Sequence, residues 1–158
     1  MKELSRLIVE DLKIRNETIS FMESCTGGFL ANEITNTDGA SNVLKVSIVT
    51  YSNEYKIKFG VNENTINEYS VYSTQTANEM AKQISDFAKS DWGVGVTGEL
   101  GDVGATCGRP NIVYYAIYNR NTGEFFSNSI IAKGNDREEK KRFVGECIQE
   151  ELCKRIKN

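Results

Sequence analysis

Apolar residues near the start of the chain recur at the spacing of an α-helix. Leu4, Leu7, Ile8 and Leu12 fall on one helical face, which predicts an amphipathic helix over about residues 2–14. Further along, short runs of apolar and β-branched residues alternate with helical patterns. The runs predict strands at 18–22, 43–50, 92–97, 111–118 and 125–132, and the patterns predict helices at 27–35, 53–59, 74–89 and a final one that reaches about residue 156.

Local signals indicate where several of these elements begin and end. Ser73 can cap the long helix that follows it, and Asn135 with Glu138 resembles a capping box before the final helix. Residues 119–123, Asn-Arg-Asn-Thr-Gly, predict a hairpin between the last two strands. The polar connector at 62–72 has room for one helical turn.

The order of the elements favours a single α/β domain. Strands separated by helices predict a mostly parallel sheet that is covered on both faces, and the hairpin adds an antiparallel pair. The chain has 158 residues, which is long enough for one sizeable core. We therefore expect one domain over residues 1–158.

The composition is that of an ordinary soluble globular protein, with 39% hydrophobic and 26% charged residues. The net charge of −3 gives no general attraction to nucleic acid or acidic membranes. Residues 136–157 mix both signs of charge and are typical of a solvated helix face. With no signal-peptide pattern and no long apolar run, we expect a cytoplasmic protein that binds neither nucleic acid nor membrane.

The chain has no histidine, and none of its four cysteines lies in a Cys-x-x-Cys pair. These absences exclude the usual zinc and dithiol signatures and most catalytic zinc sites, so we expect no metal and no cofactor. The cysteines should be reduced thiols. Any serine nucleophile must then be activated by another side chain, for which lysine is the obvious candidate.

Three segments that follow predicted strands should meet at one edge of the sheet. A helix joins the first two strands, which should therefore be parallel, with their carboxyl ends together. Ser24 follows the first strand, Tyr51 and Lys56 follow the second, and Thr97 and Gly98 follow the third. Ligands in open α/β sheets bind at this edge, where the strand order reverses.

A glycine-rich turn follows Ser24. Thr26, Gly27 and Gly28 let the backbone turn sharply, and free N–H groups at the start of the next helix can bind an anion. That anion would be a phosphate or the oxyanion of a tetrahedral intermediate. The alternative is a plain strand-to-helix turn that Thr26 caps.

Lys56 is the candidate base for Ser24. It must lose its proton near neutral pH, which requires its pKa of about 10.4 to fall by roughly three units, and burial would contribute to that shift. Glu23 and Glu54 should point elsewhere, because pairing with them would oppose the shift. Tyr51 would relay the proton or hold Ser24. The alternatives are a surface lysine and an ordinary half-buried tyrosine.

Cys25 is a rival nucleophile, since thiolates attack acyl groups well. Without histidine, its thiol would need Lys56 or the helix terminus for activation. A small buried structural cysteine is the alternative role.

Taken together, several segments resemble the CinA C-terminal domain family. The similarity covers nearly the whole chain, in the same order and with similar spacing. The segments are Glu23-Ser24-Cys25-Thr26-Gly27-Gly28, Gly39-Ala40-Ser41, Val49-Thr50-Tyr51-Ser52-Asn53-Glu54-Tyr55-Lys56, Val96-Thr97-Gly98 and Gly134-Asn135-Asp136-Arg137-Glu138-Glu139.

This resemblance implies a three-layer α/β/α sandwich and a nicotinamide-nucleotide amidohydrolase activity. Such an enzyme converts nicotinamide mononucleotide to nicotinate mononucleotide and ammonia. The resemblance also implies a catalytic dyad of Ser24 and Lys56 with Tyr51 beside it. It implies a substrate pocket formed from the two motifs, Thr97, Gly98 and a phosphate-binding Arg137. The remaining expected substrate-binding residues are Thr26, Gly27, Gly28, Asn53 and Glu54.

The stretch after Gly98 departs from the family pattern. Family members continue with a Gly-Pro and glycine-rich loop, whereas this chain has Glu99, Asp102 and an irregular segment up to Asn111. The added negative charge falls where an anionic substrate would lie. Two alternatives follow, namely a non-catalytic nucleotide- or partner-binding module and an amidase or esterase with another small substrate.

We also expect a homo-oligomer. Tyr114, Tyr115 and Tyr118 lie along one predicted strand and would support contacts between chains.

Overall fold

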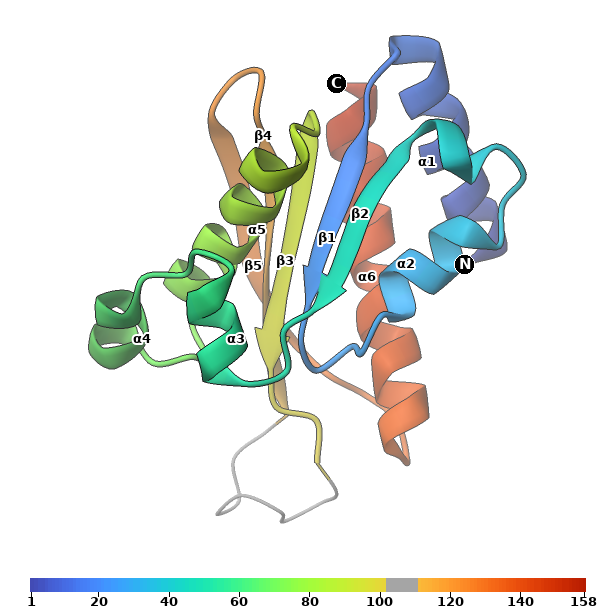
Figure 1. Ribbon diagram of the computed structural model, residues 1–158. Helices are drawn as coiled ribbons and strands as arrows, with labels where there is room; N and C mark the ends of the chain where they lie inside the picture. Colours follow the sequence, from blue (N-terminus) through green and yellow to red (C-terminus); the bar gives the residue numbers. More distant parts are fainter. Residues whose placement is uncertain (102–110) are drawn as a thin grey trace.

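A five-stranded sheet forms the centre of the molecule, with helices on both of its faces (Figure 1). The computed structural model describes residues 1–101 and 111–158. The strand order is β2-β1-β3-β4-β5, in which β1 is parallel to both β2 and β3, and β4 and β5 are antiparallel to their neighbours. The predicted α/β fold, with a mixed sheet and one C-terminal hairpin, is confirmed.

The elements agree closely with the pattern of the sequence. The helices are α1 (Lys2–Arg15), α2 (Phe29–Thr35), α3 (Asn53–Lys58), α4 (Glu63–Tyr69), α5 (Thr74–Ala88) and α6 (Arg137–Lys157), with a short 3-10 helix, η1 (Ala40–Asn42). The strands are β1 (Ile19–Glu23), β2 (Leu44–Val49), β3 (Trp92–Gly98), β4 (Ile112–Asn119) and β5 (Glu124–Ile131). The connector predicted to hold one turn contains the seven-residue helix α4.

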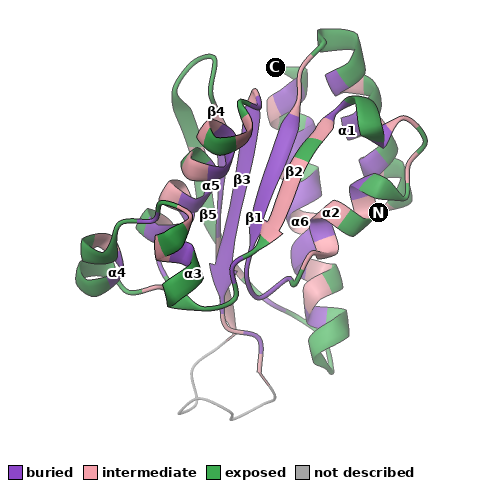
Figure 2. Ribbon diagram, viewed as in Figure 1, coloured by how far each residue is buried: buried purple, intermediate pink, exposed green. Residues whose placement is uncertain are grey.

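Helices α1, α2 and α6 cover one face of the sheet, and α5 covers the other together with α3 and α4 (Figure 1). β1 and β3 are buried throughout, whereas β5, at the edge of the sheet, is mostly exposed (Figure 2). The largest apolar cluster lies under α1, α2 and α6, and a smaller one lies under α4 and α5. The sheet is therefore the middle layer of three.

Two glycines in β3 allow α5 to lie very close to the sheet. A Cβ atom on Gly93 or Gly95 would collide with the main chain of α5 at Ala77 and Ala81. Replacing either glycine would therefore force the helix away from the strand.

Helix α6 begins one residue later than the predicted capping box. Asp136 is its N-cap and accepts a 2.8 Å hydrogen bond from the N–H of Glu139, whose carboxylate in turn accepts one of 2.8 Å from the N–H of Asn135. The predicted pair of Asn135 and Glu138 was therefore wrong. The neighbouring aspartate and glutamate have the same spacing of three and take these roles instead.

The tyrosines of β4 do not form an exposed face. Tyr115 and Tyr118 are buried within this chain, and Tyr118 packs against the ring of Phe125 and the alanines of α5. Tyr115 and Tyr118 are therefore not available for contacts between chains, Tyr114 is partly buried, and the expected homo-oligomer stays a prediction. Alternation along the strand places them against the protein's own two helical layers.

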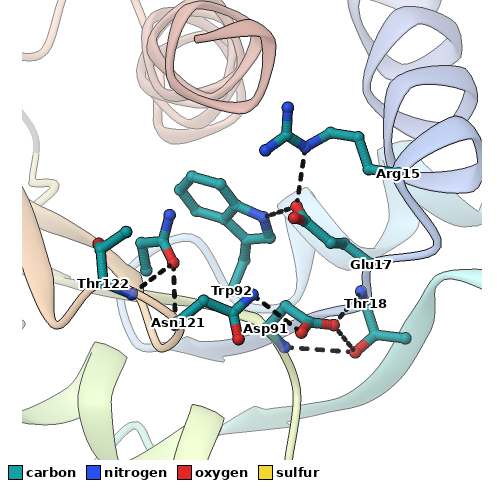
Figure 3. A network of polar contacts seen from close by, with 8 residues as sticks. Arg15, Glu17, Thr18, Asp91, Trp92, Asn121 and Thr122 are labelled. Atoms are coloured by element: carbon teal, nitrogen blue, oxygen red, sulfur yellow. Dashed lines mark hydrogen bonds and ion pairs between the residues drawn. The ribbon is translucent and has the colours of Figure 1, made fainter.

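A network of polar contacts joins the amino ends of β1 and β3 (Figure 3). The Trp92 indole donates a 2.7 Å hydrogen bond to Glu17, and the carboxylate of Asp91 accepts bonds from the N–H of Thr18 at 2.8 Å and from Asn121 at 3.2 Å. The central strands are thereby fixed at the end opposite to the predicted site.

Among the described residues, no helix combines the length and the apolar character needed to cross a bilayer.

Candidate active site

Ser24 lies in a tight turn immediately after β1. The N–H of Gly27 donates a 2.9 Å hydrogen bond to the carbonyl of Ser24, which closes the turn. Gly27 and Gly28 have φ angles of 61° and 92°, in the left-handed region that favours glycine. These angles delay the start of α2 to Phe29, two residues later than predicted, and leave the Ser24 side chain at the carboxyl edge of the sheet.

Lys56 reaches the same edge from α3. Ser52 caps this helix by accepting a hydrogen bond from the N–H of Tyr55. Side chains on a helix lean toward its N-terminus, and here that lean carries the lysine amine back over the end of β2. Its Nζ lies 3.0 Å from Ser24 Oγ and 2.7 Å from the carbonyl oxygen of Thr50. The structure therefore brings the two predicted dyad residues into hydrogen-bond contact.

The surroundings of Lys56 favour its neutral form. The residue is only 1% exposed, and this burial lowers the pKa of its amine. A neutral amine has two hydrogens and one lone pair. When one hydrogen is donated to Thr50, the lone pair is free to accept the hydroxyl proton of Ser24.

The two nearby glutamates point away from Lys56, as expected. Glu23 is fully buried, and its carboxylate accepts hydrogen bonds from the N–H groups of Leu30 at 3.0 Å and Ala31 at 3.2 Å. Burial raises the pKa of Glu23, and these backbone donors partly offset the effect. Glu54 faces solvent and pairs with Lys58 at 2.8 Å.

The position of Glu23 corrects one expectation about anion binding. The start of α2 was expected to offer free N–H groups to a ligand, but Glu23 accepts hydrogen bonds from Leu30 and Ala31 there. The N–H of Gly27 is also used, by the carbonyl of Ser24. In the described part of the chain, the N–H of Cys25 makes no backbone hydrogen bond, and Cys25 lies directly after the candidate nucleophile.

A cavity of about 120 Å³ opens beside the dyad. Six of the predicted site residues line it, and five further residues were not predicted to bind substrate. The predicted residues are Ser24, Tyr51, Asn53, Lys56, Gly98 and Arg137, and the others are Cys25, Val71, Tyr72, Glu99 and Leu100.

Arg137, the first residue of α6, joins two walls of this cavity. One arm of its guanidinium donates to the carbonyl of Leu100, and another donates to the Tyr51 hydroxyl at 3.0 Å. One turn later, the buried Lys140 donates to the carbonyl of Gly101. The start of α6 thus holds the segment after β3 in place.

Five predicted substrate-binding residues lie outside the cavity lining. The hydroxyl of Thr97 donates a 3.0 Å hydrogen bond to the carbonyl of Val71, so it supports the wall without facing the cavity. Glu54 is turned toward solvent by its ion pair. The others are Thr26, which is buried, and Gly27 and Gly28, which form the turn. Most of the irregular 99–111 stretch, residues 102–110, lies outside the described residues.

Cys25 is a poor candidate for the nucleophile. Burial raises the pKa of its thiol to about 12, so the thiol is protonated at neutral pH. Cys25, Cys147 and Cys153 are free thiols, and Cys107 lies outside the described residues. Within the described ranges, no cluster of cysteine and carboxylate side chains has the arrangement of a metal site.

Comparison with known families matches residues 1–151 to the CinA C-terminal domain. The chain belongs to this family. Among curated relatives, it is 41% identical over 115 residues to a competence-damage inducible protein of Caldanaerobacter subterraneus and 37% identical over 125 residues to a CinA-like protein of Thermosipho melanesiensis. These alignments cover 72% and 78% of this chain but only 28% and 31% of the relatives, so the chain spans less than a third of their length.

Solved structures share the fold over nearly the whole chain. The competence/damage inducible protein CihA from Agrobacterium tumefaciens superposes with a TM-score of 0.91 at 30% identity, covering 99% of this chain and 95% of that one. A CinA superfamily protein from Klebsiella pneumoniae has a TM-score of 0.91 at 25% identity, with 98% and 96% coverage. The three-layer architecture is thus that of CinA structures.

Proposed function

We propose that this CinA-family domain is an amidohydrolase that deamidates nicotinamide mononucleotide through a serine–lysine dyad. The observation that carries the proposal is the buried contact of 3.0 Å between Lys56 Nζ and Ser24 Oγ, beside a cavity at the carboxyl edge of the sheet. A buried lysine with a lowered pKa in contact with a hydroxyl nucleophile is an arrangement suited to acyl transfer.

In the first half of the reaction, neutral Lys56 takes the hydroxyl proton while Ser24 Oγ forms a bond to the carboxamide carbon. The carbonyl oxygen becomes an oxyanion. The N–H of Cys25, the residue directly after Ser24, would donate a hydrogen bond to it. The carbon–nitrogen bond then breaks, and the Lys56 ammonium gives its proton to the leaving nitrogen. Ammonia departs and leaves an ester on Ser24.

In the second half, Lys56 takes a proton from water as the water oxygen attacks the ester carbon. The bond to Ser24 Oγ breaks, the serine regains its proton from Lys56, and the nicotinate product leaves. The Thr50 carbonyl accepts a hydrogen bond from the amine at 2.7 Å, which directs the lone pair of the neutral amine toward Ser24 in both halves. No metal or cofactor takes part in this scheme.

The size of the cavity supports one orientation of the proposed substrate. A volume of about 120 Å³ is well below the roughly 300 Å³ or more of a pocket that encloses a whole small-molecule ligand. The carboxamide and part of the ring would therefore enter the cavity, and the ribose and phosphate would lie at its mouth.

The test is ammonia release from nicotinamide mononucleotide by the purified protein and by the Ser24→Ala and Lys56→Ala variants. We expect loss of about 100-fold or more in kcat for each variant. Turnover like that of the wild type in both variants would exclude the dyad. A panel of other amides distinguishes an amidase with a different substrate.

A binding module without catalysis is the second candidate, and Glu99 in the cavity wall favours it. It predicts nucleotide binding by the unaltered protein with no ammonia release at any pH between 6 and 10. We further propose that the protein is a homo-oligomer and that its substrate is a small nucleotide. Sedimentation analysis of the purified protein tests the oligomeric state.

A further inference from the structure

Two positions of α6, Lys141 and Gly145, face the turn and the start of α2 that follow Ser24. Gly145 leaves room for the ring of Phe29, because a Cβ atom there would collide with that ring. One turn earlier, the amine of Lys141 lies 3.5 Å from the position that a Cβ atom on Gly27 would occupy. Lys141 therefore lies directly beside the turn that follows the nucleophile.

The same face of α6 continues to Arg137, one further turn toward the start of the helix. Positions 137 and 141 are four residues apart and lie on the same helical face. Arg137 lines the cavity and contacts the Tyr51 hydroxyl at 3.0 Å. One face of α6 thus carries two cations. Arg137 lies in the cavity wall, and Lys141 lies outside the lining, beside the turn at Gly27.

The charge of Lys141 is available to a ligand. Its acidic neighbours on the helix are already engaged, since Glu138 pairs with Arg142 at 3.1 Å and Glu139 accepts a hydrogen bond from the N–H of Asn135. Among the described residues, no carboxylate lies within ion-pair distance of the Lys141 amine. The guanidinium of Arg137, by contrast, already donates hydrogen bonds to the carbonyl of Leu100 and to the Tyr51 hydroxyl.

We propose that Lys141, together with Arg137, binds the phosphate of the substrate at the mouth of the cavity. This inference rests on the proposed function, because it takes a nucleotide as the substrate. A phosphate monoester carries a charge of about −1.5 to −2 at neutral pH, which suits two cations better than one partly engaged guanidinium. Lys141 is then a specificity residue that distinguishes a nucleotide from the corresponding nucleoside.

The experiment compares two substrates that differ only in the phosphate, nicotinamide mononucleotide and nicotinamide riboside. Ammonia release is measured for the wild type, Lys141→Gln, Lys141→Arg and Arg142→Gln. Arg142→Gln is the matched control, because it removes a cation from the same helix at an exposed position that already has a carboxylate partner.

We expect Lys141→Gln to raise KM for the nucleotide about tenfold, the effect of losing roughly one charge-assisted hydrogen bond. Its kcat/KM for the riboside should stay within about twofold of the wild type, Lys141→Arg should recover most of the loss, and Arg142→Gln should change neither substrate. The salt dependence of the nucleotide KM should also weaken in Lys141→Gln. Equal effects on both substrates, or no effect on either, would overturn the proposal.

Binding measurements separate this proposal from the proposed reaction. If the wild type releases ammonia from neither compound, the amidohydrolase proposal fails, and calorimetric binding of the same two compounds then decides the role of Lys141. Tighter binding of the nucleotide than of the riboside, lost in Lys141→Gln, supports the phosphate site. Equal affinities for the nucleotide and the riboside, or an affinity for the nucleotide that Lys141→Gln leaves unchanged, would refute it.

Discussion

Replacing Lys56 by methionine removes the amine and keeps an apolar side chain of similar length. In the folded protein, this residue is 1% exposed, and its amine contacts Ser24 Oγ and the carbonyl of Thr50. Burial lowers the pKa of the amine below its ordinary value of 10.5. The unfolded chain has no such burial, so folding and protonation of Lys56 oppose each other.

The sign and size of the effect follow from this difference in pKa. Between the lowered pKa of the folded state and 10.5, the unfolded chain binds more protons than the folded one. The free energy of unfolding of the wild type therefore rises with pH across that window, by about 1.4 kcal/mol for each unit by which the pKa is lowered. Below the window the destabilisation is present in full. Lys56→Met lacks this titration.

The assay is urea denaturation of the wild type and Lys56→Met at several pH values from 7 to 10.5, with Lys58→Met as a control at an exposed lysine. We expect the stability difference to move in favour of the wild type as the pH rises, while Lys58→Met follows the wild type. The kcat of the wild type should rise with pH across the same window. Parallel stability curves for the wild type and Lys56→Met would mean that burial does not shift Lys56, and would refute the argument for a neutral base.

Three further substitutions test other parts of the fold and site. Gly95→Ala should lower the free energy of unfolding by about 1–3 kcal/mol, since its Cβ would collide with the main chain of α5, and urea titration measures this. Cys25→Ala should retain ammonia release within a few-fold, because a thiol with a pKa of about 12 is no nucleophile at neutral pH. A large loss would instead revive the cysteine alternative. Glu23→Gln should destabilise by about 1–3 kcal/mol through its weaker bonds to Leu30 and Ala31, seen as a lower Tm with an unchanged CD spectrum.

The meeting of Ser24 and Lys56 could be predicted from the sequence, because two parallel strands joined by a helix must place their carboxyl ends together. The direction of the Thr97 side chain could not be predicted from the sequence. Its place at the end of β3 was predicted, but the alternation of side chains sends its hydroxyl to Val71 and away from the cavity.

The resemblance predicted Arg137, which lines the cavity, but the other contributions of α6 were beyond the sequence. Its mixed charges indicate a solvated face, yet Lys140 is buried and Lys141 lies against the motif turn. These roles depend on how the helix is rotated about its axis, which packing of distant elements decides. The roles of Val71 and Tyr72 in the cavity wall were missed for a different reason, because no periodic pattern marks the connector before α5.

The register between β1 and β2 determines the distance between Ser24 and Lys56. Glu23 pairs with Val49, and the N–H of Thr50 continues the ladder by donating to the carbonyl of Glu23 at 2.9 Å. Ser24 and the carbonyl that holds Lys56 come directly after this last rung. A slip of one residue between the strands would separate the amine from the hydroxyl, whatever side chains surround them. The fraction of protein labelled by a reagent that reacts covalently with Ser24 would therefore report the fraction of molecules whose strands are in the correct register. During refolding, the time course of labelling would report when that register forms.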